Sequence, residues 1–314
     1  MRTGLVMDAT CDLPRDFISQ HGITVLPIRV ELDGHAFPDR RDPDDVRRFL
    51  ERDGRLSATH ADTAPLSAPD IETFILDELV TRYDCLFCLT TSAARSDIHA
   101  NLEKAAFGVL KRYREVREQA GHQGQFLLRV IDTQTLFAGS GALVAEAAHL
   151  IAEGQAPGAI RERLGVLARH ACGYLLPRDL HYLRARTRRK GDRSIGWVGA
   201  TLGSALDIKP LLCGWRGQTG PVARPRGFEN GAQTLFEHAA ARARAGLMTP
   251  TVCLGYGGEL DIMRNLPGYE ALTRACADGG VALLESPMSI AGMVNVGEGA
   301  LTLGYLCEDD PLSL

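Results

Sequence analysis

The chain of 314 residues has no long apolar run and no excess of positive charge. None of its apolar stretches approaches the roughly 20 residues that a membrane-spanning helix needs, and the N-terminus lacks a basic segment followed by an apolar signal core. The net charge is −4, whereas general nucleic-acid binding usually requires a basic excess. We therefore expect a cytoplasmic protein that has no transmembrane segment and binds no nucleic acid.

Residues that form disulfide frameworks or metal sites are also scarce. Eight cysteines are too few for a disulfide framework in so long a chain, and the nine histidines form no cluster at metal-ligand spacing. Cys85 and Cys88 lie inside the apolar string "DCLFCL", which is typical of a buried strand. We expect no metal and no cofactor, and we expect the cysteines to be small core residues.

The pattern that is present is an alternation of strands and helices, which favours an α/β fold with parallel or mixed sheets. Apolar residues make up 45% of the chain and charged residues 24%, as in ordinary globular proteins. The expected strands are Gly4–Met7, Ile23–Val30, Cys85–Leu89, Leu127–Ile131, Thr251–Gly255 and Val281–Glu285, and the expected helices are Leu13–Gln20, Asp44–Glu51, Pro69–Tyr83, Ile98–Arg114 and Ala142–Ala152. The polar, Gly- and Pro-containing segment "EGQAPGAIRERL" predicts a boundary between domains 1–155 and 156–314.

Polar side chains follow the first expected strand at the point where it ends. Asp12 stands just before Pro14 and a helical segment, which makes it a natural N-cap. Asp8 and Thr10 lie at the carboxyl edge of the strand, where open α/β sheets bind their ligands. Asp8 is therefore either a loop residue that accepts hydrogen bonds or a ligand contact.

A second polar cluster has the same placement. Thr90, Thr91 and Ser92 end a buried strand, and a helix follows from about Ser96. Hydroxyls beside the free N–H groups of a helix start suit a carboxylate or a phosphate. The simpler alternative is that Ser96 and Asp97 cap this helix.

These motifs together resemble the DegV family, which are bacterial fatty-acid-binding proteins. "MDATCDLP" is similar to the family's opening T-D-S-T-A-D-L-P, and "TAPLSAPDIETF", with Thr63 before a helix capped near Ser67, is similar to T-S-Q-P-S-P-x-x-F. "LTTSAARSDIHA" resembles I-S-S-x-L-S-G-T-x-x-S-A, and "VIDTQTLFAGSGALVAEAA" resembles V-I-D-S-x-x-x-x-G-x-G-x-L-V-x-E-A-A. "DLHYLR", "LGSALDIKPLL" and "VGEGALTLGYL" continue the resemblance to about residue 306.

The resemblance implies two α/β domains, an N-terminal parallel sheet with helices on both faces and a C-terminal mixed sheet, with the ligand site between them. It implies a non-catalytic protein that holds one long-chain fatty acid and offers it to an ATP-dependent fatty acid kinase, which forms an acyl phosphate for phospholipid synthesis. The ligand-binding residues that it implies are Thr63, Thr90, Thr91, Ser92, Ser96, Asp8 and Asn295. The residues implied in docking the kinase are Arg188, Arg189, Lys190 and Arg226.

The chain departs from the family pattern beside the expected carboxylate site. Leu-Ser-Gly-Thr is replaced by Ala93–Ser96, which introduces Arg95. Arg95 either adds a positive charge to that site or faces solvent, and we favour solvent because long charged side chains seldom bury unpaired. Asn295 stands in place of a histidine and Glu298 in place of a proline; an asparagine donates a hydrogen bond but carries no charge. The basic stretch "RARTRRKGDR" is either a solvated face or a docking surface.

Two enzyme functions compete with lipid binding. Gly139 and Gly141 form half of a dinucleotide-binding fingerprint, but the third glycine is missing at its spacing. A hydrolase or other small-molecule enzyme that uses the hydroxyls of Thr63 and Thr91 would need a base, and His60 is the candidate. The sequence contains no Gly-x-Ser-x-Gly elbow to place a nucleophile. The hydrolase remains the alternative function.

Overall fold

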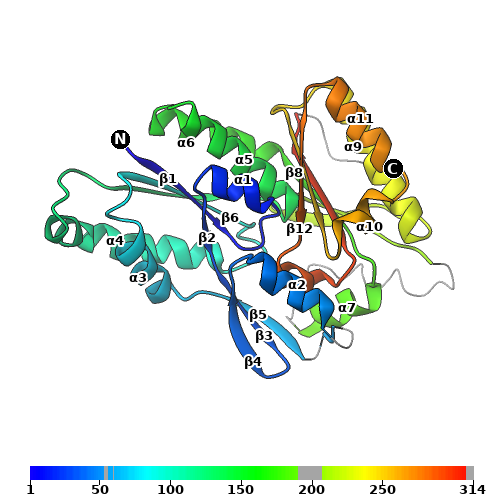
Figure 1. Cartoon of the computed structure of the whole chain (residues 1–314), viewed down its shortest axis with the longest axis horizontal. Coiled ribbons are helices and arrows are strands. Elements are labelled where there is room, and N and C mark those ends of the chain that lie inside the picture. The colour runs from blue at the N-terminus through cyan, green and yellow to red at the C-terminus, as the bar shows by residue number, and fades with distance from the viewer. Residues whose placement is uncertain (53–55, 59, 190–206, 309–314) are drawn as a thin grey trace.

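The computed structural model describes residues 1–52, 56–58, 60–189 and 207–308. Strands and helices alternate as expected for an α/β protein, and the strands form three sheets (Figure 1). The elements of the first half are β1 (Thr3–Asp8), α1 (Arg15–Gln20), β2 (Thr24–Leu26), β3 (Ile28–Leu32), β4 (His35–Asp39), α2 (Pro43–Glu51), β5 (Ala61–Pro65), α3 (Ala68–Glu78), β6 (Cys85–Thr90), α4 (Ile98–Gln119), β7 (Leu127–Asp132) and α5 (Ala138–Ala152). The second half contains α6 (Pro157–Leu167), the 3-10 turn η1 (Ala168–His170), β8 (Ala171–Leu176), α7 (Leu180–Arg189), β9 (Leu211–Trp215), β10 (Gln218–Ala223), α9 (Phe228–Ala245), β11 (Thr251–Tyr256), α10 (Leu260–Arg264), α11 (Tyr269–Asp278), β12 (Ala282–Pro287), α12 (Ile290–Val296) and β13 (Leu301–Leu306).

The first sheet is parallel and has the strand order β2-β1-β6-β7. Its strands are largely apolar, and all six residues of β6 are buried, because helices cover both faces. Helices α3 and α4 lie on one face, and α1, α5 and α6 lie on the other (Figure 1). The expectation of an N-terminal parallel sheet with helices on both faces is confirmed.

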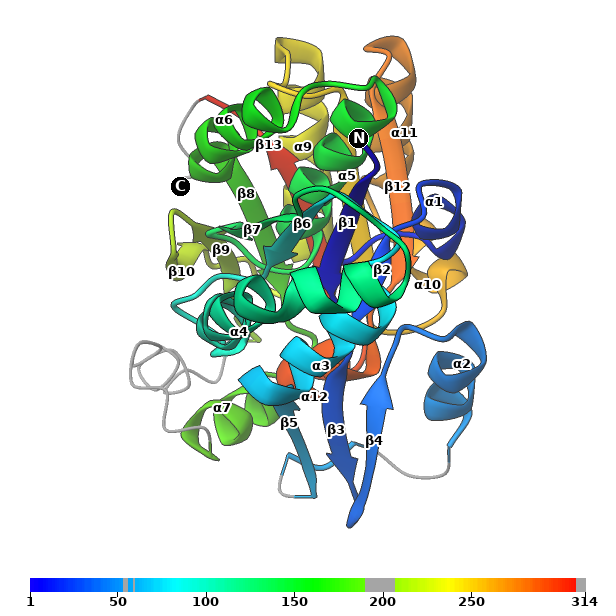
Figure 2. The same cartoon turned by 90° about the vertical axis from the view of Figure 1, so that its left-hand side faces the viewer.

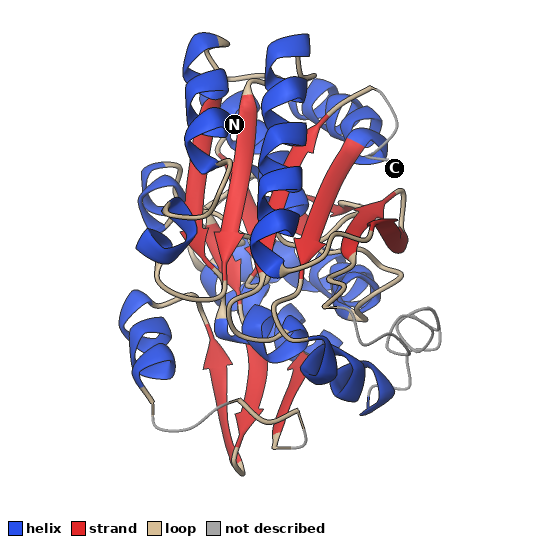
Figure 3. Cartoon of the chain, turned by 90° about the vertical axis from the view of Figure 1, so that its right-hand side faces the viewer, coloured by secondary structure: helices blue, strands red, loops and turns tan. Residues whose placement is uncertain are grey.

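The second sheet is mixed and has the order β10-β9-β8-β13-β11-β12, with only β11 and β12 parallel. Helices α9 and α11 cover its outer face, and α5 packs against its inner face (Figures 1 and 3). Helix α5 also packs against the first sheet, so it lies between the two sheets. A helix buried on all sides is apolar all round, and "AGSGALVAEAAHLIA" has that composition.

The glycines of α5 let its backbone approach the sheets closely. A Cβ atom on Gly141 would lie 2.2 Å from the carbonyl oxygen of Asp12, and one on Gly304 in β13 would lie 2.1 Å from the amide nitrogen of Gly139. Backbone atoms cannot move away as the end of a flexible side chain can. The pair Gly139 and Gly141 is therefore accounted for by helix packing, without a dinucleotide.

Substituting Gly141 tests this packing. We expect Gly141→Ala to lower the free energy of unfolding by about 1–3 kcal/mol or more, the cost of overpacking a core. Gly165 is the matched control, since it occupies an exposed position of α6 with no atom within 4 Å of an added Cβ. Gly165→Ala should instead raise stability by about 0.5–1 kcal/mol through helix propensity. Urea unfolding measures both, and equal effects of the two substitutions would contradict the packing role.

A third, antiparallel sheet of order β4-β3-β5 was not expected. The single strand predicted at Ile23–Val30 is wrong, because Pro27 divides it: β2 pairs with β1 in the parallel sheet, while β3 enters the third sheet. Proline lacks the N–H that a continuous ladder needs. Figure 2 shows β3, β4 and β5 extending away from the parallel sheet, below α3 and α12.

The prediction that Asp12 caps a helix is also wrong. Helix α1 begins at Arg15 after Pro14, with no side-chain cap, and Asp12 is completely buried. The Thr302 hydroxyl donates to Asp12 Oδ2 at 2.7 Å, and the Arg41 guanidinium lies 3.6 Å from Oδ1. Asp12 thus connects the loop after β1 to the mixed sheet, and burial raises its pKa from 3.8 to about 6.

The structure shows where the cysteines and the other potential metal ligands lie. All eight cysteines are buried and free, which confirms that they are core residues. No group of three His, Cys, Asp or Glu side chains placed to hold a metal occurs among the described residues. Within the same residues, no helix is both long and apolar enough to cross a membrane.

Candidate functional site

A cavity of about 170 Å³ lies where the carboxyl ends of β1 and β6 face β5, α7, β9 and α12. Both halves of the chain line it. Its apolar lining consists of Ile28, Pro65, Leu136, Phe137, Leu175, Leu183, Leu212 and Val296. Its polar lining consists of Thr10, Thr63, Thr91, Arg95, Ser96, Arg186, Thr187, Thr219 and Asn295.

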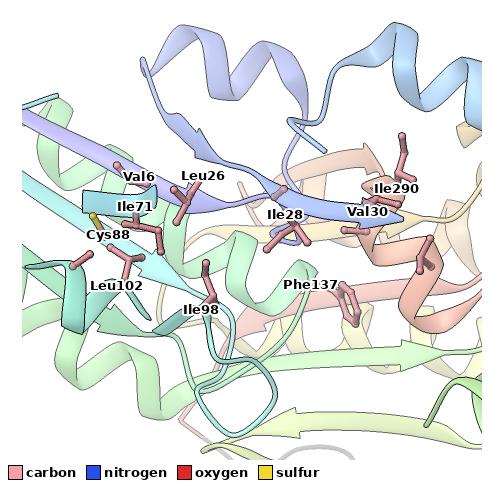
Figure 4. Close-up of a cluster of buried hydrophobic side chains, with 14 of the residues drawn as sticks. Val6, Leu26, Ile28, Val30, Ile71, Cys88, Ile98, Leu102, Phe137 and Ile290 are labelled. Carbon is pink, nitrogen blue, oxygen red and sulfur yellow. The ribbon is translucent and has the colours of Figure 1, made fainter. Parts of the chain in front are cut away.

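The apolar lining is continuous with a core of the protein. Ile28, Phe137, Leu175, Leu183, Leu212 and Val296 all belong to one cluster of buried hydrophobic side chains. Figure 4 shows Ile28 and Phe137 within this cluster, with Val30 and Ile290 nearby. A ligand that entered this part of the cavity would contact hydrocarbon on its sides, which suits an alkyl chain.

Two residues of the polar lining, Thr63 and Asn295, are joined by a hydrogen bond. The Thr63 hydroxyl donates to Asn295 Oδ1 at 3.2 Å, and Asn295 Nδ2 donates to the carbonyl of Ala291 at 2.9 Å. Residues 63 and 295 come from β5 and α12, so the third sheet and the C-terminal part of the chain meet here. Both side chains line the cavity, where the hydroxyl and amide are able to bind a polar ligand group.

The loop between β6 and α4 supplies Thr91 and Ser96. The Thr91 hydroxyl donates to the carbonyl of Thr135 at a long 3.4 Å, and the Ser96 hydroxyl accepts from the amide of Ile98 at 3.3 Å. Ser96 thus accepts from the first amide of α4 and also lines the cavity, whereas Asp97, the N-cap residue, makes no side-chain cap hydrogen bond. The hydrogen bond of Ser96 to the start of α4 is compatible with its place in the cavity lining.

Asp8 organises this loop from outside the cavity lining. It is buried, and its carboxylate accepts from the amide of Thr91 at 2.6 Å and from the amide of Thr10 at 2.9 Å. Burial raises its pKa, and the hydrogen bonds from Thr10 and Thr91 oppose that rise. Asp8 therefore positions Thr91 through the backbone, and its hydrogen bonds are internal to the protein.

Thr90 and Ser92 also lie outside the lining. The Thr90 hydroxyl is 3.1 Å from His99 Nδ1 and is buried. The Ser92 amide donates to the carbonyl of Thr135 at 3.0 Å, and its hydroxyl accepts from the amide of Ala94 at 3.3 Å. Of the seven expected ligand residues, the structure thus brings Thr63, Thr91, Ser96 and Asn295 to one cavity.

Three of the four basic residues expected to dock a partner are described, and they lie on the surface. Arg188 and Arg189 are exposed at the end of α7, and Arg226 is exposed just before α9. Lys190 lies outside the described residues. None of the three described arginines lines the cavity.

Two other arginines do line the cavity. The expectation that Arg95 faces solvent is wrong: its side chain is half-buried, and Nε donates to the Thr219 hydroxyl at 3.1 Å. Arg186 was not expected at the site at all and is only 2% exposed. The sequence contained a signal for the burial of Arg186, because Arg186 follows Leu183 by three residues and so lies on the same buried face of α7. The run of basic residues around it indicated a solvent-exposed position instead.

The described lining of the cavity contains no His, Asp or Glu side chain that could act as a base for a hydrolase. The His60 side chain is 69% exposed and lines a separate hollow with Asp33 and Arg189. The nearest hydroxyl and histidine pair in the region is Thr90 with His99, and Thr90 is fully buried away from the cavity. A nucleophile must reach its substrate as well as its base.

Comparison with known proteins gives one family throughout. A family model described as "Uncharacterised protein, DegV family" matches residues 2–308. A DegV domain-containing protein of Xanthomonas axonopodis pv. citri is 51% identical over 313 residues, covering both chains completely. A fatty-acid-binding DegV family protein from Thermus thermophilus is 24% identical with a TM-score of 0.71, over 98% of this chain and 100% of that one. The Streptococcus pneumoniae Fatty Acid Kinase B3 protein, loaded with linoleic acid, is 16% identical with a TM-score of 0.71 over the same shares.

Proposed function

Because this chain belongs to the DegV family, we propose that it holds one long-chain fatty acid in the cavity described above. The carboxylate lies at the polar end, near Thr63, Thr91 and Asn295, and the acyl chain lies against Ile28, Leu212 and the rest of the apolar lining. The observation that carries the proposal is that hydroxyl and amide groups line the same cavity as hydrocarbon side chains of the protein core. The fatty-acid-binding relatives of the same fold support it.

The two ends of the cavity would contribute differently to binding. A buried carboxylate needs several donors to offset its desolvation, and each hydrogen bond to it is worth about 1.5–3 kcal/mol. The acyl chain supplies affinity at about 0.8 kcal/mol for each buried CH₂. The cavity is smaller than the roughly 300–1,000 Å³ of typical ligand pockets, so a long chain would have to displace lining side chains.

The remaining parts of the proposal concern the setting of this site. Residues 1–155 and 156–314 form the two domains that enclose the ligand, and the chain itself performs no catalysis. It works in the cytoplasm and presents the carboxylate to an ATP-dependent fatty acid kinase, which forms the acyl phosphate. The kinase relationship rests on the resemblance to the Fatty Acid Kinase B3 protein.

Organic extraction of the purified protein tests fatty acid binding. The denatured protein should release close to one equivalent of a long-chain fatty acid, identified by its mass. An extract without acyl species, from protein that also fails to bind added oleate or palmitate, would reject the proposal. Release of p-nitrophenol from short esters, abolished by Thr63→Val, would favour the hydrolase instead.

Removal of the carboxylate donors should weaken binding without unfolding the protein. Thr63→Val and Thr91→Val keep the side-chain shape, and each should cost about 1.5–3 kcal/mol of oleate binding. Thr90→Val is the matched control, because Thr90 ends β6 directly before Thr91 but lies outside the cavity lining. Calorimetric titration with oleate measures all three variants. If Thr63→Val and Thr91→Val bind as tightly as Thr90→Val does, the carboxylate lies elsewhere.

Charge reversal at the exposed arginines separates docking from binding. The double variant Arg189→Glu, Arg226→Glu should keep its fatty acid but slow acyl phosphate formation by the kinase, since rim charges act mainly on association. The slowing should shrink as salt is added, because screening acts over about 8–10 Å at physiological ionic strength. Loss of lipid from this variant would place the arginines in the binding site, and unchanged turnover would assign them to a solvated face.

A further inference from the structure

The charged side chains described in the lining of the cavity are all cationic. Two arginines, Arg95 and Arg186, line it, and no Asp or Glu occurs among the described lining residues. Charges enclosed by low-dielectric walls act more strongly on a ligand than charges in open solvent do. The lining therefore favours an anion over a neutral polar group.

Arg186 is the more deeply placed of the two, and its guanidinium is only partly used by the protein. One terminal nitrogen donates to the carbonyl of Ala61 at 2.9 Å, and the other donates to Asp62 Oδ1 at 2.6 Å. Its Nε is buried and has no hydrogen-bond partner among the residues that the structure describes. A buried charged group with an unused donor is costly, and a ligand acceptor would remove that cost.

Arg186 is also in contact with Thr63, one of the expected carboxylate donors. Its second terminal nitrogen lies 3.5 Å from the Thr63 hydroxyl, which in turn donates to Asn295. Asp62 would compete with a ligand carboxylate for Arg186, because the Asp62 side chain, which is 44% exposed, already forms an ion pair with the guanidinium. A ligand carboxylate would meet the attraction of Arg186 and the repulsion of Asp62 together.

From these observations, and resting on the proposed function, we propose that Arg186 is the charge partner of the bound carboxylate and makes the cavity select ionised fatty acids over neutral lipids of the same chain length. An arginine holds a carboxylate through paired, charge-assisted hydrogen bonds. An alcohol or a methyl ester gains no such interaction. Arg186 is thus the specificity-determining residue of the polar end, and Thr63 and Thr91 add hydrogen bonds to it.

The experiment compares oleate with oleyl alcohol on the full-length protein, with each affinity measured by displacement of a fluorescent fatty acid. The wild-type protein should prefer oleate, and Arg186→Gln should weaken oleate binding by about 10- to 100-fold while leaving oleyl alcohol nearly unchanged. Arg186→Lys should retain part of the preference because it keeps the charge. Asp62→Asn removes the competing carboxylate and should raise oleate affinity without affecting oleyl alcohol.

The ratio of the two affinities separates a charge partner from a structural residue, because loosening of the fold would weaken both ligands alike. An unchanged ratio in Arg186→Gln would overturn the inference while the proposed function stood. If Arg186→Gln does not fold, Asp62→Asn decides: a rise in the ratio supports the inference, and an unchanged or lower ratio overturns it. If the wild-type protein binds neither oleate nor oleyl alcohol, the proposed function fails and the inference fails with it.

Discussion

Leu212→Trp is expected to lower the affinity for oleate by more than about a hundredfold, because excluding even a few methylene groups costs about 0.8 kcal/mol each. Leu212 lies on β9, is 2% exposed and lines the apolar part of the cavity. The larger indole would occupy the space that the acyl chain needs. Calorimetric titration with oleate, together with extraction of the purified variant, measures the effect.

The control for Leu212→Trp is a substitution of the same kind in a different cavity. A hollow of about 360 Å³ lies between α1, α2 and α10, and Leu50 of α2 lines it. Leu50→Trp should leave oleate binding unchanged, since no residue is shared between the two linings. If Leu50→Trp abolishes binding and Leu212→Trp does not, the larger hollow is the lipid site and our assignment is wrong.

Asp12→Asn is expected to change how stability depends on pH. The pKa of Asp12 is raised from 3.8 to about 6, mainly by burial, and the Arg41 guanidinium offsets only part of this rise. The folded protein therefore binds the proton more tightly than the unfolded chain does. The contribution of Asp12 to the free energy of unfolding is fully present below about pH 4 and falls as the pH rises from about 4 to 6. Above about pH 6 the ionisation of Asp12 changes the stability no further.

Relative to wild type, Asp12→Asn should therefore gain about 3 kcal/mol of stability between pH 4 and pH 7, at 1.36 kcal/mol for each pKa unit. Urea unfolding at a series of pH values measures this difference, in which the other titrating groups cancel. Asp84→Asn is a control of opposite sign, because hydrogen bonds from Arg2 and Arg117 hold the pKa of Asp84 below its usual range. Its contribution to stability is lost as the pH falls through the acid range. A flat difference for Asp12→Asn would show that Asp12 is not a buried, ionising carboxylate.

The first half of the fold could be predicted from the sequence because the signals for its strands and helices are local. The strands at Gly4–Met7, Cys85–Leu89 and Leu127–Ile131 are apolar runs bounded by polar residues, and each lies within an observed strand. The helix predicted at Pro69–Tyr83 starts near its true N-cap, Ser67, whose hydroxyl accepts from the amide of Asp70. That helix ends earlier than predicted, at Glu78, and helix ends are weakly encoded.

The second half could be predicted only in part, because glycines lie inside two of its strands. Strands β8 and β13 read "ACGYLL" and "LTLGYL", and their central glycines weaken any strand signal. These glycines face α5, where a side chain would meet its backbone or the turn before it. Tertiary packing requires these glycines, and the periodicity of apolar residues along the sequence gives no information about such packing. The boundary at 155/156 stays a prediction.

At the site, the sequence predicted the hydroxyls but not the charge. Thr63, Thr91 and Asn295 follow from motif resemblance, and Asp8 follows from its place at a strand end. Arg186 lies in a run of basic residues, and only the packing of α7 against β5 buries it beside Asp62. Charge runs usually mark solvated surfaces, so this interior role required the structure.

A crystal structure of the protein with bound oleate tests the central claim most directly. We predict one oleate in the cavity, with its carboxylate within hydrogen-bond distance of the Thr63 hydroxyl and the Arg186 guanidinium. Its acyl chain should run between Phe137, Leu175 and Leu212. An oleate in the hollow beneath α1 and α2, or one with its carboxylate turned to solvent away from Thr63, would contradict this account.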